Sequence, residues 1–175
     1  CTGLRILIYC RRKAEARTDR EIDYCVGCNQ GCYDGFENMD MECITCLRNP
    51  ALGREKECEI HPTEKPETVL VAGGGIAGLE AAIILKKRGH NPILCEATDT
   101  LGGQFLTAGE APRKKEMKAA AISMAKKAER LGVDIRMNTK VTPELIEEIK
   151  PHTVMNAIGA ESIVPQISGV EKAFV

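Results

Sequence analysis

Short apolar runs and longer stretches with helical spacing alternate along the second half of the chain. Runs typical of buried parallel strands lie at 69–72 and 92–95. The stretch between them, 76–88, is rich in Ala, Leu and Ile, and Gly89 follows it at the usual place of a left-handed C-cap. The pattern therefore predicts a helix that connects two parallel strands.

The same alternation continues downstream. Apolar residues recur at intervals of three and four between 113 and 131, which predicts a helix with one face packed on a sheet. Apolar residues at 133–137 and 154–158 predict two further strands, with a short helix at 143–150 between them. Strands that alternate with helices indicate an α/β fold, here a Rossmann-like domain with a doubly wound parallel sheet.

The part of the chain before residue 66 lacks this pattern. Residues 1–24 are basic and poorly patterned, whereas 25–65 are rich in Cys, Gly, Asn and Asp. A segment with so few apolar residues buries little core and needs a staple. We therefore expect a short leading segment at 1–24, a small Cys-rich segment at 25–65 and the Rossmann-like domain at 66–175.

Composition and charge argue against two classes of partner. Aromatic residues make up 3% of the chain, which has no Trp and a formal net charge of -1. Because single-stranded nucleic acid is bound on aromatic and basic surfaces, this balance disfavours a nucleic-acid partner. The chain also lacks the run of about 18 apolar residues that a membrane-spanning helix needs, so no membrane partner is expected.

A glycine-rich loop joins the first predicted strand to the first predicted helix. Gly73 permits a tight turn, Gly75 lets the backbone approach a pyrophosphate, and Gly78 lets helix and strand pack closely. The helix start at Ile76 and Ala77 offers N–H groups and the positive end of a dipole to the phosphates. This strand–loop–helix context predicts a dinucleotide site rather than a turn without a ligand.

An acidic residue and two small-residue segments complete the predicted site. Glu96 ends the second strand, where a carboxylate accepts hydrogen bonds from the adenosine ribose and repels a 2′-phosphate. The glycines of 101–104 and the small residues of 157–160 provide further close crossings, which favour FAD over a plain NAD domain. The candidate cofactor-binding residues are Gly73, Gly75, Ile76, Ala77, Gly78, Glu96, Ala97, Gly103, Gln104, Ala157 and Gly159.

The Cys-rich segment contains six of the nine cysteines, with spacings that favour a metal site over disulfides. One possible set joins the three cysteines of 25–32 to Cys46 and suits the irons of a cubane cluster. The other joins the two Cys-x-x-Cys pairs at 25–28 and 43–46, like a zinc ribbon. Spacing alone leaves iron and zinc open, and either metal suggests a reducing cytoplasm.

The cysteine segment resembles that of a known enzyme family. Residues 25–32, 46–50 and 53–55 are similar to the iron–sulfur segment of old-yellow-enzyme-like flavoenzymes. This family includes 2,4-dienoyl-CoA reductase, clostridial enoate reductase and trimethylamine dehydrogenase. The resemblance selects Cys46 over Cys43, because Cys46 precedes an Asn-Pro pair, although the interval after the first three cysteines is longer than usual. It implies a [4Fe-4S] cluster with the ligands Cys25, Cys28, Cys32 and Cys46.

Segments of the predicted Rossmann-like domain resemble the same family. Residues 69–82, 101–104 and 138–141 are similar to its FAD-binding segments, and the last of them adds Val141 to the candidate FAD contacts. The resemblance covers about residues 12–170. The cysteine motif is specific to the family, whereas many flavoproteins share the glycine loop.

The resemblance also implies a longer enzyme. Family members carry an FMN-binding barrel before this region and a nicotinamide domain after it, so we expect residues 1–24 to be the remnant of the barrel or a linker. Electrons would pass from NAD(P)H through FAD and [4Fe-4S] to FMN and reduce an activated C=C bond of an enoate or dienoyl-CoA. Without those domains we expect no activity and assign no catalytic residue. The alternative is a zinc-stapled nucleotide-binding protein with no redox role.

Overall fold

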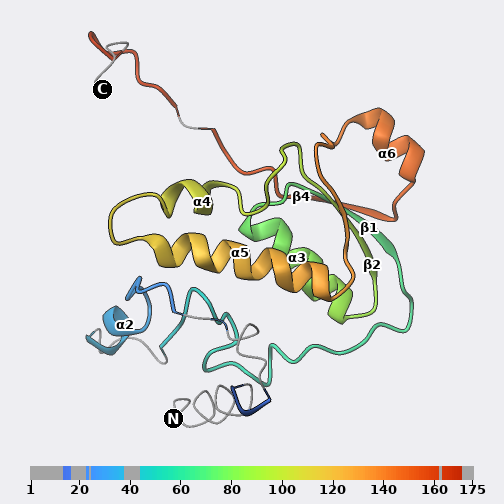
Figure 1. The fold of residues 1–175 in the computed structure, drawn as a ribbon. Helices are drawn as coiled ribbons and strands as arrows, with labels where there is room; N and C mark the ends of the chain where they lie inside the picture. The colour runs from blue at the N-terminus through green and yellow to red at the C-terminus, as the bar shows by residue number, and fades with distance from the viewer. Residues whose placement is uncertain (1–13, 17–22, 24, 38–43, 162, 171–175) are drawn as a thin grey trace.

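The computed structural model describes residues 14–16, 23, 25–37, 44–161 and 163–170 (Figure 1). Most of the leading segment 1–24 lies outside the described residues, as does Cys43. The Cys-rich segment contains one short helix among its described residues, α2, Tyr33–Glu37.

The sheet has four parallel strands in the order β3-β2-β1-β4. Their bounds are Thr68–Ala72 for β1, Asn91–Cys95 for β2, Asp134–Arg136 for β3 and Thr153–Asn156 for β4. All four predicted strands are present, and the predicted α/β fold with a parallel sheet is confirmed. The predicted third and fourth strands were one or two residues too long at their carboxyl ends.

The two long helices cover one face of the sheet (Figure 1). The long helices α3, Ile76–Lys87, and α5, Lys115–Arg130, pack against each other on one side, with the short α4, Gln104–Ala108, next to α5. Along the chain, the short α6, Pro143–Ile149, follows β3 and precedes β4. It lies toward the other side of the sheet. A right-handed crossover requires this, because β4 lies on the opposite flank of β1 from β3.

The hydrophobic core lies between β1, β2 and the two long helices. Val71, Leu79 and Leu94 are fully buried in it, and Met124 of α5 belongs to the same buried cluster. Burying each such side chain contributes about 1.5–3 kcal/mol. The three- and four-residue spacing that predicted α5 is confirmed by its buried residues, which are Ala120, Ala121, Met124 and Ala128.

The strand order places a topological switch point at the carboxyl end of β1. From β1 the chain moves to β2 and β3 on one side, and then returns to β4 on the other side. Ligands of open α/β sheets bind in the crevice at such a point, outside the carboxyl ends of the strands. Gly73, Glu96 and Ala157, which follow β1, β2 and β4, all lie at this edge.

Candidate functional site

The loop after β1 needs glycine at Gly73 for two reasons. Its φ of 107° lies in the left-handed region, where a side chain is strained. A Cβ at this position would also clash with the carbonyl oxygen of Ala157 in the segment after β4. The backbone N–H of Gly73 donates to the carbonyl of Cys95 at 2.8 Å, so the loop is held between both neighbouring strands.

The other two predicted loop glycines have different surroundings. A Cβ on Gly78 would collide with the carbonyl oxygen of Gly73, so α3 packs directly on the loop that precedes it. A Cβ on Gly75 would meet no atom within 4 Å. Gly75 is therefore open, as expected where a ligand approaches the backbone.

The helix that follows the loop, α3, has no side-chain cap at its N-terminus. Gly75 is the N-cap of α3, and no side chain caps it by a hydrogen bond. Ile76 is half buried and Ala77 is exposed, so the first turn is accessible from solvent. Its N–H groups and the helix dipole favour an anion at this position.

The segment from Gly102 to Gln104 runs beside the glycine loop. Gly102 forms a parallel bridge with Gly75, and its N–H donates to the carbonyl of Gly74 at 2.8 Å. A Cβ on Gly103 would lie 3.1 Å from the Cα of Gly75. The Gln104 side chain donates from Nε2 to the carbonyl of Ala160 at 2.6 Å. This hydrogen bond links α4 to the segment that follows β4.

The remaining predicted residues lie around this edge at different depths. Ala157 is half buried and continues the β4 ladder, because its N–H donates to the carbonyl of Ala72 at 2.8 Å. Gly159 has a φ of 79° and open space at its Cβ position. Ala97 is exposed beside Glu96, and Val141 is half buried in the segment before α6. Their contact with a cofactor stays a prediction.

The Glu96 carboxylate is held by three hydrogen bonds from the protein. The N–H of Gly74 donates to its Oε2 at 2.6 Å. The N–H and hydroxyl of Thr98 donate to its Oε1 at 2.8 and 2.9 Å. Burial opposes ionisation of this carboxyl, but the hydrogen bonds from Thr98 and Gly74 outweigh that effect and lower its pKa.

The lowered pKa of Glu96 predicts how stability depends on pH. A carboxyl with a depressed folded-state pKa stabilises the fold above its ordinary value of 4.5, and this contribution is lost as pH falls through the folded-state pKa. The free energy of unfolding of the Glu96→Gln variant should therefore approach that of the unaltered chain as pH drops below 4.5. Urea unfolding of both proteins over an acid pH series checks it. A difference that grows on acidification would contradict the assignment.

The features at this edge together fit the ADP part of a dinucleotide. The open Gly75 leaves room for a pyrophosphate, and the uncapped start of α3 supplies donors to it. The ionised Glu96 lies at the neighbouring strand end, where it can accept a hydrogen bond from a ribose hydroxyl. The sequence pattern indicates these groups but not Thr98. The Thr98-x-Thr100 pattern, which is typical of a turn supported by side chains, is the signal that points to it.

Three of the predicted metal ligands, Cys25, Cys28 and Cys32, lie before α2, and the fourth, Cys46, lies after it. Thr45 donates its N–H to the carbonyl of Gly31 at 2.9 Å, which brings the chain before Cys46 beside the Cys25–Cys32 loop. The N–H of Gly27 donates to the Cys25 sulfur at 3.3 Å. Within the described part of the chain, no group of three or more His, Cys, Asp or Glu is placed to hold a metal ion. Four cysteine thiolates fit the ligation of an iron–sulfur cluster. That the four bind one cluster together stays a prediction.

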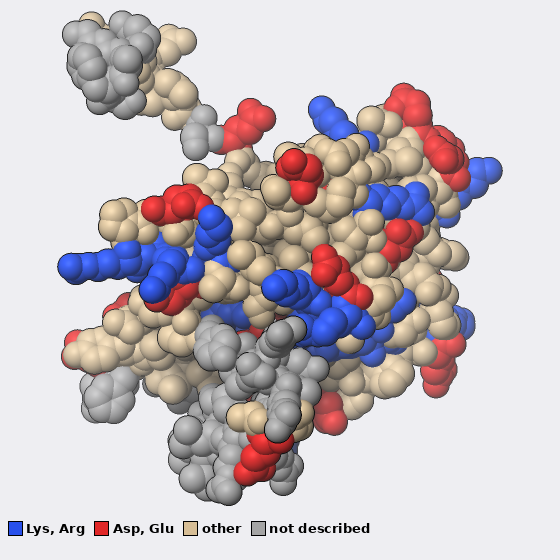
Figure 2. All heavy atoms as spheres, in the orientation of Figure 1, with Lys and Arg blue, Asp and Glu red and all other residues tan. Residues whose placement is uncertain are grey.

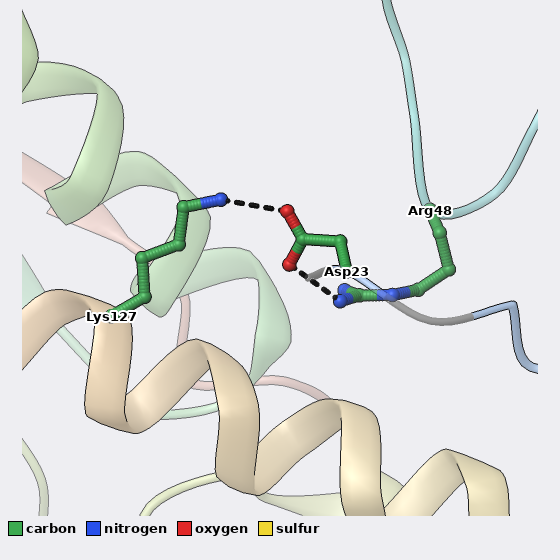
Figure 3. Close-up of polar contacts among 3 residues, drawn as sticks. All are labelled: Asp23, Arg48 and Lys127. Carbon is green, nitrogen blue, oxygen red and sulfur yellow. Dashed lines mark hydrogen bonds and ion pairs between the residues drawn. The ribbon is translucent and has the colours of Figure 1, made fainter. Parts of the chain in front are cut away.

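The Cys-rich segment is joined to α5 through Asp23 (Figure 3). The Asp23 carboxylate receives a hydrogen bond from Arg48 at 3.1 Å and another from Lys127 of α5 at 3.0 Å. Asp23 and Arg48 lie two residues outside Cys25 and Cys46, at the two ends of the predicted ligand set. A cavity of about 400 Å³ beside them is lined by Cys25, Arg48, Glu116, Ala119, Ala120 and Ser123.

We expect Asp23 to matter more for stability than Lys127. Replacing Asp23 by Ala removes an acceptor from Arg48 and Lys127 at once, whereas Lys127→Met removes one pair and keeps most of the apolar stem. Because these groups are partly solvent-exposed, the losses should be about 1–2 kcal/mol for Asp23→Ala and below about 1 kcal/mol for Lys127→Met. Urea unfolding measures both. Equal losses in the two variants would show that Asp23 does not bridge the segments.

Charges on the surface are mixed in sign. On the face shown in Figure 2, Lys and Arg side chains gather over α5, with Asp and Glu side chains close to them. This mixture agrees with the net charge of -1. No helix within the described residues is both long and apolar enough to cross a bilayer.

Known proteins match most of this chain. The sequence model of the FAD-dependent oxidoreductase family matches residues 68–164. Bilirubin reductase of Mediterraneibacter gnavus is 37% identical over 158 residues, which cover 90% of this chain and 24% of the relative. Cinnamate reductase of Clostridium sporogenes is 33% identical over 150 residues, covering 86% of this chain and 22% of the relative.

A solved structure shows the same fold. The complex of 2-naphthoyl-CoA reductase with 2-naphthoyl-CoA matches 94% of this chain with a TM-score of 0.86 and 28% identity, and 25% of that protein is covered. The chain spans about a quarter of the length of each of these three proteins. These matches confirm the resemblance to flavin-dependent reductases that the sequence indicated. The chain belongs to the FAD-dependent oxidoreductase family.

Proposed function

We propose that this chain is the FAD-binding and electron-transfer part of a flavin and iron–sulfur oxidoreductase. The observation that carries the proposal is the open Gly75 at the start of α3, next to the ionised carboxylate of Glu96. A pyrophosphate fits the first and a ribose fits the second, so the two together favour an adenine dinucleotide. The family match makes FAD the dinucleotide of choice.

The protein groups have separate tasks in this proposal. N–H groups of Ile76 and Ala77 bind the phosphates, and Glu96 binds the adenosine ribose. Contacts with the rest of the cofactor are assigned, on the sequence pattern and the family resemblance, to Ala97, Gly103, Gln104, Val141, Ala157 and Gly159. FAD, when bound, supplies a centre that takes two electrons together and gives them up one at a time.

A [4Fe-4S] cluster is the proposed one-electron partner of the flavin. Its ligands would be the thiolates of Cys25, Cys28, Cys32 and Cys46. The N–H that Gly27 directs at the Cys25 sulfur supports this role, because hydrogen bonds to ligating sulfurs help to set the potential of a cluster. The Asp23 bridge would keep the cluster segment at a fixed place on α5.

The proposed reaction of the whole enzyme is reduction of an activated C=C bond. The relatives bear the names of reductases for cinnamate, bilirubin and 2-naphthoyl-CoA, and cinnamate carries a C=C bond conjugated with a carboxylate. Electrons would pass from NAD(P)H through FAD and the cluster to FMN, in a reducing cytoplasm. The FMN barrel and the nicotinamide domain would be the partners of this chain, which alone should reduce no enoate.

Nucleotide titration tests the core of the proposal. Calorimetry of the chain with ADP and with FAD should give similar affinities, because the groups described here contact the ADP part that the two ligands share. ADP that carries an added 2′-phosphate should bind at least about tenfold more weakly than ADP itself, because Glu96 repels the 2′-phosphate. Absence of ADP and FAD binding would refute a nucleotide site at this loop.

A further inference from the structure

The turn after β2 holds the Glu96 carboxylate by two donors of one residue, Thr98. The N–H and the hydroxyl of Thr98 both reach Oε1 of Glu96, at 2.8 and 2.9 Å. Gly74 donates to the other oxygen, Oε2, at 2.6 Å. We propose that Thr98 is a positioning residue of the nucleotide site, which fixes one oxygen of Glu96 so that the carboxylate faces a ribose with free hydroxyls. This inference rests on the proposed nucleotide function.

Two acceptors lie within reach of the Thr98 hydroxyl, and the negative charge of Glu96 makes its carboxylate the preferred one. Its oxygen lies 2.9 Å from Oε1 of Glu96 and 3.1 Å from the carbonyl of Thr100, but it carries one proton. The carboxylate is ionised and is the nearer acceptor, so it forms the stronger bond. The N–H of Thr100 donates back to the Thr98 hydroxyl at 3.4 Å and orients it toward Glu96.

The fixed carboxylate keeps only part of its accepting capacity. Two carboxylate oxygens offer about four lone-pair positions, and three are filled by Gly74 and Thr98. The open position belongs mainly to Oε2, since Oε1 already accepts two donors. A hydroxyl donor such as ribose therefore meets a carboxylate whose orientation was set before the ligand arrived, which lowers the entropy cost of binding.

The backbone around Thr98 is anchored independently of its side chain. The carbonyl of Thr98 accepts the N–H of Asn138 at 2.9 Å, and the carbonyl of Glu96 accepts the N–H of Thr139 at 2.8 Å. Both donors lie in the segment after β3. Because Thr98 is also solvent-exposed, replacing its side chain should leave the turn in place. A binding defect in such a variant then reports on the hydroxyl itself.

Two ligands and three variants test the role of the hydroxyl. ADP carries both ribose hydroxyls, and 2′,3′-dideoxy-ADP carries neither. Thr98→Val should weaken ADP binding by roughly three- to tenfold and leave the affinity for 2′,3′-dideoxy-ADP unchanged. Thr98→Ser restores a hydroxyl and should bind ADP within about twofold of the unaltered chain. Thr100→Val, the matched control, keeps the backbone groups that contact Thr98 and should change neither affinity.

The two ligands also separate failure of this inference from failure of the proposed function. The inference is wrong if the Thr98→Val variant binds ADP as tightly as the unaltered chain does. It is also wrong if the variant loses affinity for ADP and for 2′,3′-dideoxy-ADP equally, because Thr98 then does not act through the ribose contact. If the unaltered chain binds both ligands equally well, a phosphate site exists without the ribose contact, and the inference again fails. If the unaltered chain binds neither ligand, the proposed function itself is wrong.

Discussion

Gly75→Val should abolish measurable ADP binding while the chain stays folded. A Cβ at Gly75 meets no protein atom within 4 Å, and its φ of -70° suits any residue, so the fold can accept the side chain. The valine would instead occupy the space proposed for the pyrophosphate. Losing two charge-assisted hydrogen bonds of about 1.5–3 kcal/mol each weakens binding at least about a hundredfold. Calorimetry with ADP measures the loss, and circular dichroism checks the fold.

The same substitution three residues later is the matched control. A side chain at Gly78 would collide with the carbonyl oxygen of Gly73, so Gly78→Val should destabilise the fold by about 3 kcal/mol or more. Urea unfolding would show this loss, whereas the midpoint for Gly75→Val should move little. If Gly75→Val bound ADP normally, the open space would be unrelated to a ligand. If both variants unfolded alike, the two glycines would share one packing role.

Cys32→Ser should remove the iron–sulfur chromophore from the chain. A cubane cluster needs four thiolate ligands, and serine oxygen is a poor replacement for one of them. The broad brown absorbance that dithionite bleaches should therefore be lost in Cys32→Ser and in Cys46→Ser. Cys58→Ser, at an exposed cysteine outside the ligand set, should keep it. Visible spectra of anaerobically reconstituted proteins measure the effect.

A fourth cysteine variant tests the choice of ligand set. Cys43→Ser should keep the chromophore, because the proposed set uses Cys46, whose chain is brought to the Cys25–Cys32 loop by the Thr45–Gly31 hydrogen bond. The opposite pattern, with Cys43→Ser colourless and Cys32→Ser brown, would assign the ligands to the two Cys-x-x-Cys pairs. That outcome would favour the zinc-ribbon arrangement.

The local parts of the site could be predicted from the sequence. Gly73, Gly75, Gly78 and Glu96 lie within one strand–helix–strand unit, where each residue's task follows from its distance to the strand end. The apolar face of α5 also depends only on residues close in sequence, so their three- and four-residue spacing predicts which face is buried. The short α4 was missed, because five residues with no buried member leave no periodic signal.

The non-local parts could not be predicted, because they depend on the order of the strands. Gly73 is confined by Ala157, which is distant in sequence and becomes a neighbour only because β4 pairs with β1. The ion pair of Asp23 with Lys127 joins residues 104 positions apart, and no pattern in the sequence marks such a pair. The hydroxyl of Thr98 is local, yet its use depends on where the Glu96 side chain turns.

Iron and acid-labile sulfide analysis of the anaerobically reconstituted chain tests the central claim most directly. If the chain is a flavin and iron–sulfur electron-transfer unit, it should contain about four iron and four sulfide per molecule, together with a site for FAD. One zinc per chain with no sulfide would contradict the claim, and would leave a zinc-stapled nucleotide-binding domain without a redox centre of its own.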